Sequence, residues 1–397
     1  RGINIKVFPF SYNPVQNILN VYHKIVARLS YSGKGVVNVK ARKQNTINNF
    51  FEPIYKQHFI NYESGGKYPM VGEDGRILVI CYSSFMDEIA PYVEWKIQKG
   101  IQTDLYDVAT IGNTTTNIDN FIQNQYNLGD GLTFVQLVGD ASQVVTPTYS
   151  GGGSDPSYTL VDGNDDYPDI VIGRFSAENS TQIETQIERT IHYERDLSWG
   201  GWLHEGTGIA SDQGSGYGWQ GNADWEHLDY LRDMLLNYNY TAVDQFYDTG
   251  TPTASDVSNS LNNGRGIVNY CGHGSTYSWA TTGFSSSDIN NLTNDFKLPF
   301  IHSVGCVNGN FVSSTCFAET WLRATNSSDG DPTGAVAMYA SSINQSWTPP
   351  MVAQDYSTQH LVYENFFSIG ALWYNGSCAM IDIMGQDGVD MFMTWHI

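Results

Sequence analysis

Two apolar runs decide the fold of this chain, and each leads to a reactive side chain. Residues 266–274 read GIVNYCGHG and lead to His273, and residues 299–311 read PFIHSVGCVNGNF and contain Cys306. Short apolar runs bounded by small residues are typical of buried strands in a parallel sheet. Functional groups of such sheets lie just beyond the carboxyl ends of strands. His273 and Cys306 are therefore either a catalytic pair or two buried residues that happen to end two strands.

Apolar strands alternate with helices on both sides of these runs. Strands are predicted at 76–82, 102–110, 133–140 and 169–176, with helices at 86–100, 116–127 and 180–197. After a break at 197–206, strands are predicted at 207–212, 241–248, 266–274, 298–306 and 334–342, with helices at 223–238, 253–263, 288–294 and 317–325. This alternation predicts an α/β fold with mostly parallel sheets covered on both faces. We expect a first α/β subdomain at 76–200 and a second, catalytic one at 205–397.

Residues 1–65 have a different pattern. KVFPFSYNP and LNVYHKIVARLSYS alternate like strands around a turn at Asn13-Pro14, and the basic stretch KARKQN follows. We interpret this segment as the end of an upstream β-rich domain plus a connector. Because the chain begins with Arg1, we expect a fragment or a processed form of a longer protein.

The composition limits the function classes. Of 397 residues, 41% are hydrophobic and 15% are charged, which is enough apolar material for a globular core. The net charge of −21 repels nucleic acid and attracts cations, and an acidic surface also keeps secreted proteins soluble. No run of 18 apolar residues exists, so no membrane span is expected.

The five cysteines are an odd number without a CxxC pair, which argues against a disulfide framework and a zinc site. Cys81 and Cys378 have apolar surroundings and are expected to be inert, Cys271 is expected to be a core thiol, and Cys316 is expected to pack. A cysteine nucleophile needs a nearby base and backbone donors for the oxyanion. We predict His273 as the base, the N–H groups of Gly274 and Cys306 as the oxyanion hole, and Asp212 as the carboxylate that orients the imidazole.

Isolated histidines and buried cysteines are more often structural than catalytic, so these residue types leave both interpretations open. The other candidate bases are His192, His204, His227 and His302. His302 lies within the strand that leads to Cys306, and we expect it to be structural.

Longer motifs around this pair resemble those of the gingipain-type cysteine peptidases. They are CGHGS, GCVNGNF, CFAETWLRA, GDPTGAVAMYASSINQSW and PPMVAQD, with FVQLVGD, IVIGRFSAE and IERTIHYERD upstream. The resemblance covers roughly residues 76–397 and is nearer to the arginine-specific members than to the lysine-specific one. It implies a caspase-like fold of two αβα subdomains and secretion through the type IX system.

The resemblance also implies residue roles. Cys306 takes the place of the nucleophile, His273 that of the general base, and Asp212 that of the orienting residue. At that third position the arginine-specific members have Glu and the lysine-specific member has Asp.

The acidic floor of the family's arginine pocket falls on Asp224, with Asp229 and Glu226 as alternatives, and Trp347 and Gln345 match the pocket wall. A guanidinium pairs with a carboxylate and stacks on an aromatic ring, so this set favours arginine over lysine. Alternatively, Asp224 is simply an acidic residue that the helix dipole favours.

Residues 1–65 resemble the end of the gingipain pro-domain. In that case a basic residue among Lys40, Arg42 and Lys43 could occupy the pocket until it is cut, although a solvated basic loop is an equally simple explanation. The family binds structural calcium, and the loops DGNDD (162–166) and NDDYPD (164–169) offer oxygen ligands. No cofactor is expected for the chemistry.

We therefore predict a secreted or cell-surface cysteine endopeptidase that cleaves after a basic residue, Arg favoured over Lys. Its expected partners are protein or peptide substrates and its own pro-segment as inhibitor. One alternative is a sortase-like transpeptidase of type IX secretion, since transfer uses the same acyl-enzyme. The other is a surface binding protein that keeps the fold but has lost the chemistry.

Overall fold

The computed structural model describes residues 6–26 and 71–397 apart from residue 365, and the chain divides into a unit at 1–65 and a unit at 66–397. In the first unit, β1 (Phe10–Asn13) and β2 (Ile18–Val21) form an antiparallel hairpin. Asn13 Oδ1 accepts the N–H groups of Val15 and Gln16 and so stabilises the turn. The predicted turn at Asn13-Pro14 between two strands is confirmed within residues 6–26, whereas Lys40, Arg42 and Lys43 lie outside the described residues.

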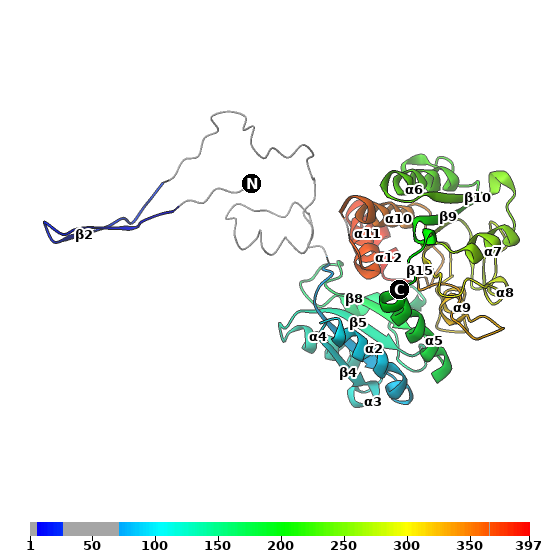
Figure 1. Cartoon of the computed structure of the whole chain (residues 1–397), viewed down its shortest axis with the longest axis horizontal. Helices are drawn as coiled ribbons and strands as arrows, with labels where there is room; N and C mark the ends of the chain where they lie inside the picture. The colour runs from blue at the N-terminus through cyan, green and yellow to red at the C-terminus, as the bar shows by residue number, and fades with distance from the viewer. Residues whose placement is uncertain (1–5, 27–70, 365) are drawn as a thin grey trace. The chain divides into compact units, whose positions relative to one another are not determined.

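The first sheet of the larger unit contains four parallel strands in the order β4-β3-β5-β8. These are β3 (Arg76–Cys81), β4 (Thr103–Asp107), β5 (Leu132–Val138) and β8 (Val171–Phe175). Helices α2 (Met86–Gln98) and α5 (Ser180–Ile191) pack on the Val79 face, and α4 (Thr115–Tyr126) packs on the Leu78 face (Figure 1). Both faces of β3 are buried, which explains its continuous apolar sequence.

The second sheet has six strands in the order β10-β9-β11-β14-β15-β16. They are β9 (Glu205–Ala210), β10 (Ala242–Tyr247), β11 (Ile267–Cys271), β14 (Phe300–Val304), β15 (Ala337–Ser341) and β16 (Trp395–His396), and only β16 is antiparallel to its neighbour. The chain runs outward from β9 to β10 and then returns to β11 on the other side of β9. The carboxyl ends of β9 and β11 therefore flank a topological switch point, where α/β proteins commonly bind ligands.

Helices cover both faces of this second sheet. Side chains of α7 (Ala254–Asn263), α8 (Ser286–Ile289) and α9 (Phe317–Arg323) form a core with Val268 and Tyr270 of β11. On the opposite face, α6 (Asp224–Tyr238) and α10 (Thr348–Gln359) pack with Ile267 and Cys271. The predicted arrangement of two sheets, each between layers of helices, is thus confirmed.

The last fifty residues connect the two sheets, and the sequence pattern did not indicate their elements. Helices α11 (Ile369–Met384) and α12 (Gln386–Phe392) pack with α10 in the larger core, and α11 also contacts β8. The Arg174 N–H of β8 donates to the Ile397 carbonyl, which follows β16. Contacts keep residues 66–397 in one unit, so the boundary between 76–200 and 205–397 stays a prediction.

Two element boundaries differ from the prediction. The expected strand 102–110 ends at Asp107, because the Asp107 side chain accepts the Ala109 N–H and begins the short helix α3 (Val108–Ile111). The expected helix 180–197 is α-helical only to Ile191 and continues as a π-helical turn at His192–Asp196.

Candidate active site

His273 lies two residues beyond the end of β11. The buried Tyr270 hydroxyl donates to the His273 carbonyl at 2.6 Å, and the Tyr270 ring stacks on Trp279 at 4.8 Å between centroids. These contacts fix the backbone while the imidazole stays exposed. The His273 Nε2 atom lies 2.9 Å from the Gln213 side-chain oxygen. The residue that lies within hydrogen-bond distance of the ring is therefore Gln213, which follows β9.

Cys306 lies two residues beyond β14, which pairs with β11 in the register Cys271↔Val304. Of the five cysteines, all of them described, Cys306 alone is not buried. The next residue, Val307, has φ of 51°, a conformation that costs energy for a β-branched side chain. Its N–H donates to the Ile343 carbonyl at 3.0 Å, which holds the turn that carries Cys306.

The backbones that carry His273 and Cys306 touch at Gly274. A Cβ atom on Gly274 would lie 2.6 Å from the Cys306 carbonyl oxygen and 2.9 Å from the Cys306 nitrogen, so only glycine permits this approach. Within residues 6–26 and 71–397, the Cys306 N–H donates to no acceptor. An unused donor beside the thiol is what an oxyanion hole requires.

Asn308 ties the two loops together. Its buried amide donates to the Ser275 carbonyl at 2.6 Å and to the Ser278 carbonyl at 3.2 Å, both in the hairpin after His273. Its Oδ1 atom accepts the Ser303 hydroxyl at 2.9 Å. The sequence analysis gave Asn308 no role, although its position two residues after Cys306 could have indicated that it belongs to the site.

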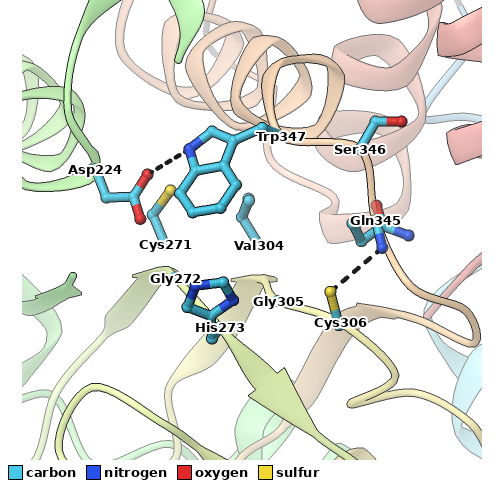
Figure 2. A pocket seen from close by; sticks show the side chains of 10 residues that line it. All are labelled: Asp224, Cys271, Gly272, His273, Val304, Gly305, Cys306, Gln345, Ser346 and Trp347. Atoms are coloured by element: carbon cyan, nitrogen blue, oxygen red, sulfur yellow. Dashed lines mark hydrogen bonds between the residues drawn. The ribbon is translucent and has the colours of Figure 1, made fainter. Parts of the chain in front are cut away.

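A pocket of about 110 Å³ brings most of the predicted site residues together. It is lined by Asp224, Cys271, Gly272, His273, Val304, Gly305, Cys306, Gln345, Ser346 and Trp347. Figure 2 shows Asp224 hydrogen-bonded to Trp347 and Cys306 hydrogen-bonded to Gln345 around the same space. The His273 and Trp347 rings meet edge to face with 5.3 Å between centroids.

Asp224 is the first residue of α6 and is 0% exposed. Its carboxylate accepts the Ser211 hydroxyl at 2.5 Å and the Trp347 indole N–H at 3.0 Å, while burial raises the pKa of the carboxyl. Gly214, at φ +83°, passes so close that a Cβ would lie 2.5 Å from Trp347 Nε1. The pocket thus contains one buried carboxylate beside an aromatic ring.

The two alternative acidic residues are used elsewhere. Asp229 accepts the Gln245 amide and the Tyr247 hydroxyl, and Glu226 accepts the Ala223 N–H at the start of α6. Neither residue lines the pocket. Burial therefore singles out Asp224 among the three.

Asp212 is exposed, and in the described part of the chain no hydrogen bond or ion pair joins it to His273. Its orienting role stays a prediction. The side chain of Gln345 is turned away from the pocket toward Ser341 and Trp395, so its backbone is what faces Cys306.

The remaining cysteines are buried, and so are two of the other candidate bases, His227 and His302. Burial raises the pKa of the thiols of Cys81, Cys271, Cys316 and Cys378, as expected for inert thiols. Burial, with the charge of His227, lowers the pKa of His302 to about 3, which agrees with the structural role predicted for it. Burial disfavours the charged form of His227, but the Asp355 carboxylate 3.2 Å away outweighs it and raises the His227 pKa.

The loops proposed for calcium use their carboxylates locally. Asp169 accepts the N–H groups of Val161 and Asp162, and Asp165 accepts that of Tyr167. Among the residues that the structure describes, no group of three or more His, Cys, Asp or Glu side chains could hold a metal ion. These loops therefore lend no support to structural calcium, which stays a prediction.

Comparison with known proteins supports the resemblance inferred from the motifs. The model of peptidase family C25 matches residues 71–394, and the model of the C25 propeptide matches residues 1–70. Gingipain R2 of Porphyromonas gingivalis is 37% identical over 407 residues, which cover 100% of this chain and 55% of the relative. The chain thus spans about half the length of this curated relative.

Two solved structures are similar as well. The crystal structure of the Arg-specific cysteine proteinase gingipain R matches with a TM-score of 0.80 at 38% identity, over 83% of this chain and 78% of that chain. The complex of the Porphyromonas gingivalis RgpB pro- and mature domains matches with a TM-score of 0.78 at 37% identity, over 81% and 78% of the respective chains.

The fold and the site define an α/β protein with a thiol and an imidazole at the carboxyl ends of neighbouring parallel strands. The chain belongs to peptidase family C25. The resemblance to gingipain-type cysteine peptidases and the fold predicted from it are confirmed.

Proposed function

We propose that the protein is a cysteine endopeptidase that cleaves after a basic residue, with arginine favoured over lysine. The observation that carries this proposal is the pocket itself. It is lined by the half-buried thiol of Cys306, the exposed imidazole of His273 and the fully buried carboxylate of Asp224. Since the chain spans only part of its relatives, the activity is inferred from this geometry together with the family.

The chemistry follows from the positions of the side chains. His273 takes the proton of Cys306, and the thiolate attacks the substrate carbonyl carbon. The N–H groups of Gly274 and Cys306 stabilise the oxyanion. The C–N bond then breaks as the imidazolium returns the proton to the leaving amine. Water attacks the thioester with His273 as base, which releases the carboxylic acid and restores the thiol.

The preference for arginine rests on Asp224 and Trp347. A guanidinium is planar and matches a carboxylate bidentately, and it stacks on aromatic rings better than an ammonium group does. Ser211 and Trp347 hold the Asp224 carboxylate in place before substrate arrives, which reduces the cost of ordering it on binding. Lysine would contribute only a point charge.

We also infer that the protein acts outside the cell or at its surface and that residues 1–70 restrain it before processing. Support for the second inference is the match of residues 1–70 to the C25 propeptide, together with the solved complex of pro- and mature domains of a relative. Within the described residues, no helix is long and apolar enough to cross a membrane. Protein or peptide substrates are the proposed partners.

Paired fluorogenic peptides that differ only in Arg, Lys or Asn before the reporter test the proposal. They should be compared on the wild type and on Cys306→Ala, with a reductant, after proteolytic removal of the pro-segment. Cleavage after Arg that disappears in Cys306→Ala is the expected result. Cleavage mainly after Lys would overturn the specificity. No hydrolysis, with or without an added amine acceptor, would favour a binding protein, and product formed only with the acceptor would favour a transpeptidase.

A further inference from the structure

The thiol of Cys306 faces a backbone donor on a third loop. The Gln345 N–H points at Cys306 Sγ with 3.4 Å between nitrogen and sulfur, within range for a hydrogen bond to sulfur (Figure 2). Residues 342–347 form this loop, between β15 and α10. The same loop carries Trp347, which contacts Asp224. One short segment therefore touches both the nucleophile and the pocket.

The side chain of Gln345 holds the loop in this position. Its amide nitrogen donates to the Ser341 hydroxyl at the end of β15, and its amide oxygen accepts the Trp395 indole N–H at 2.6 Å. Both ends of the amide are thus engaged, so the side chain is not free to rotate. Because the side chain is fixed at two points, the attached backbone N–H is fixed as well.

Trp395 is a rigid support for this contact. It belongs to β16, lies opposite Ser341 in the antiparallel pairing with β15, and is 1% exposed. Its ring packs edge to face on Tyr339 at 4.7 Å and on His302 at 5.2 Å. Trp395 itself does not line the pocket.

We propose that the Gln345 N–H stabilises the Cys306 thiolate and that Trp395 is the positioning residue that keeps this donor aimed at the sulfur. The physical reason is that a hydrogen bond to the charged form of a group favours that form, and it is stronger away from bulk water. This proposal rests on the proposed function of Cys306 as nucleophile. It adds a donor on a different loop from those of the oxyanion hole, and Trp395 of β16 holds this donor in place.

Trp395→Phe tests the proposal because it keeps a buried aromatic ring and removes the indole N–H donor with the five-membered part of the indole. The readout is the rate of Cys306 alkylation by iodoacetamide against pH, followed by mass spectrometry on the whole chain. Cys306 is the one cysteine of the five that is not buried, so native protein should react there first. We expect the pH midpoint of alkylation to rise, and kcat on the Arg peptide to fall about tenfold with KM within twofold.

The matched control is Trp321→Phe. Trp321 is 0% exposed, and its indole N–H has no partner among the described residues. The substitution therefore removes the same atoms from a buried site without removing a hydrogen bond. We expect the alkylation midpoint of Trp321→Phe to stay at the wild-type value. An unchanged midpoint in Trp395→Phe, or an equal shift in both variants, would overturn the proposal.

Gln345→Met decides the question if Trp395→Phe does not fold. It keeps the backbone N–H and the length of the side chain but loses both anchoring contacts, at a residue that is only half-buried. The same rise of the midpoint is expected, and its absence would contradict the proposal. Peptide cleavage that persists in Cys306→Ala would instead refute the proposed function, while the alkylation midpoints would still report on Gln345 and Trp395.

Discussion

The two sheets of the larger unit are built alike from mostly parallel strands, yet among the described residues only the second leaves reactive groups at its strand ends. In the first sheet, Gly139 and Asp140 follow β5 much as Gly272 and His273 follow β11. The Asp140 carboxylate, however, accepts the Ala141 N–H at 2.5 Å and lies 3.5 Å from Arg323. Asp107, at the end of β4, accepts the Ala109 N–H and the Ser83 hydroxyl.

The difference shows that a glycine and a polar residue after an apolar strand are not in themselves a catalytic signal. In the first sheet, the polar side chain forms hydrogen bonds within the turn that it begins, so it stabilises the fold. In the second sheet, Asn308 and Tyr270 supply the hydrogen bonds that hold the turns. The side chains of His273 and Cys306 and the Cys306 N–H are therefore not used to hold these turns and remain available for chemistry.

Exchanging the cysteines at the strand ends of the two sheets for alanine tests this contrast most strongly. Cys306→Ala should lower kcat on the Arg peptide roughly 10⁴-fold or more with little change in thermal stability, because the nucleophile is lost and the thiol is only half-buried. Cys81→Ala, at the buried end of β3, should keep kcat and cost on the order of 1 kcal/mol of stability. Activity assays and melting curves of both variants would check this. A Cys81→Ala variant that is stable but inactive would contradict the conclusion that the strand ends of the first sheet take no part in the chemistry.

Asp224→Asn compares two carboxylates on one helix. It should lower kcat/KM for the Arg peptide roughly 100-fold, or about 3 kcal/mol, because the guanidinium loses its counter-charge in a buried place. Cleavage after uncharged residues should change little. Asp229→Asn is the matched control, since Asp229 lies on α6 but bonds Gln245 and Tyr247 outside the pocket. A larger loss of kcat/KM in Asp229→Asn than in Asp224→Asn would show that Asp229 determines the specificity instead.

The same contrast explains which features the sequence could predict. Apolar runs mark where strands end, and the carboxyl ends of neighbouring parallel strands lie close together. His273 and Cys306 could therefore be predicted from the sequence as a possible pair at one edge of a sheet. The helix spacing around Asp224 left three acidic candidates, and only burial separates them. The strand β16 has two residues, which is too short for a periodic signal.

Other contacts between side chains far apart in the sequence could not be predicted. Gln213 reaches His273 across 60 positions and Asn308 reaches Ser275 across 33, and nothing local in either sequence marks a partner. Helix α11 was missed for another reason. Its residues from Ala371 to Ile381 are all buried, so it has no polar face to give a helical period.

Asn308→Ala tests whether the second sheet depends on its side-chain bridge. The loss of both amide contacts frees the hairpin after His273, and we expect kcat to fall roughly 10- to 30-fold because the base and the thiol are no longer aligned. Asn294→Ala is the control, as Asn294 is equally buried and its amide bonds the Lys297 and Gly334 carbonyls away from the site. That variant should lose stability and keep kcat. Equal losses of kcat in the two variants would show that Asn308 matters only for folding.

The smallest expected effect concerns two buried ion pairs. In one, the Arg174 charge overcomes burial and lowers the pKa of Asp155, while Asp155 raises that of Arg174, so neither group titrates near neutral pH. In the other, Nδ1 of His227 lies 3.2 Å from Asp355, and Nε2 lies 2.9 Å from the Gln354 oxygen. Since the Gln354 amide nitrogen donates to the Tyr270 and His302 carbonyls, its oxygen must accept, and Nε2 of His227 carries a proton.

A raised pKa in the folded state means that the contribution of His227 to stability is complete below the ordinary histidine value and is lost as the pH rises through the raised value. We therefore expect the melting temperature to fall as the pH rises above the ordinary histidine value of about 6.5. His227→Gln should start from a lower melting temperature and lack this fall. The Arg174–Asp155 pair should not contribute to this fall, because neither of its groups titrates near neutral pH. If the melting temperature of His227→Gln still falls at alkaline pH, another residue causes the pH dependence. The two ion pairs would then not differ in their response to pH.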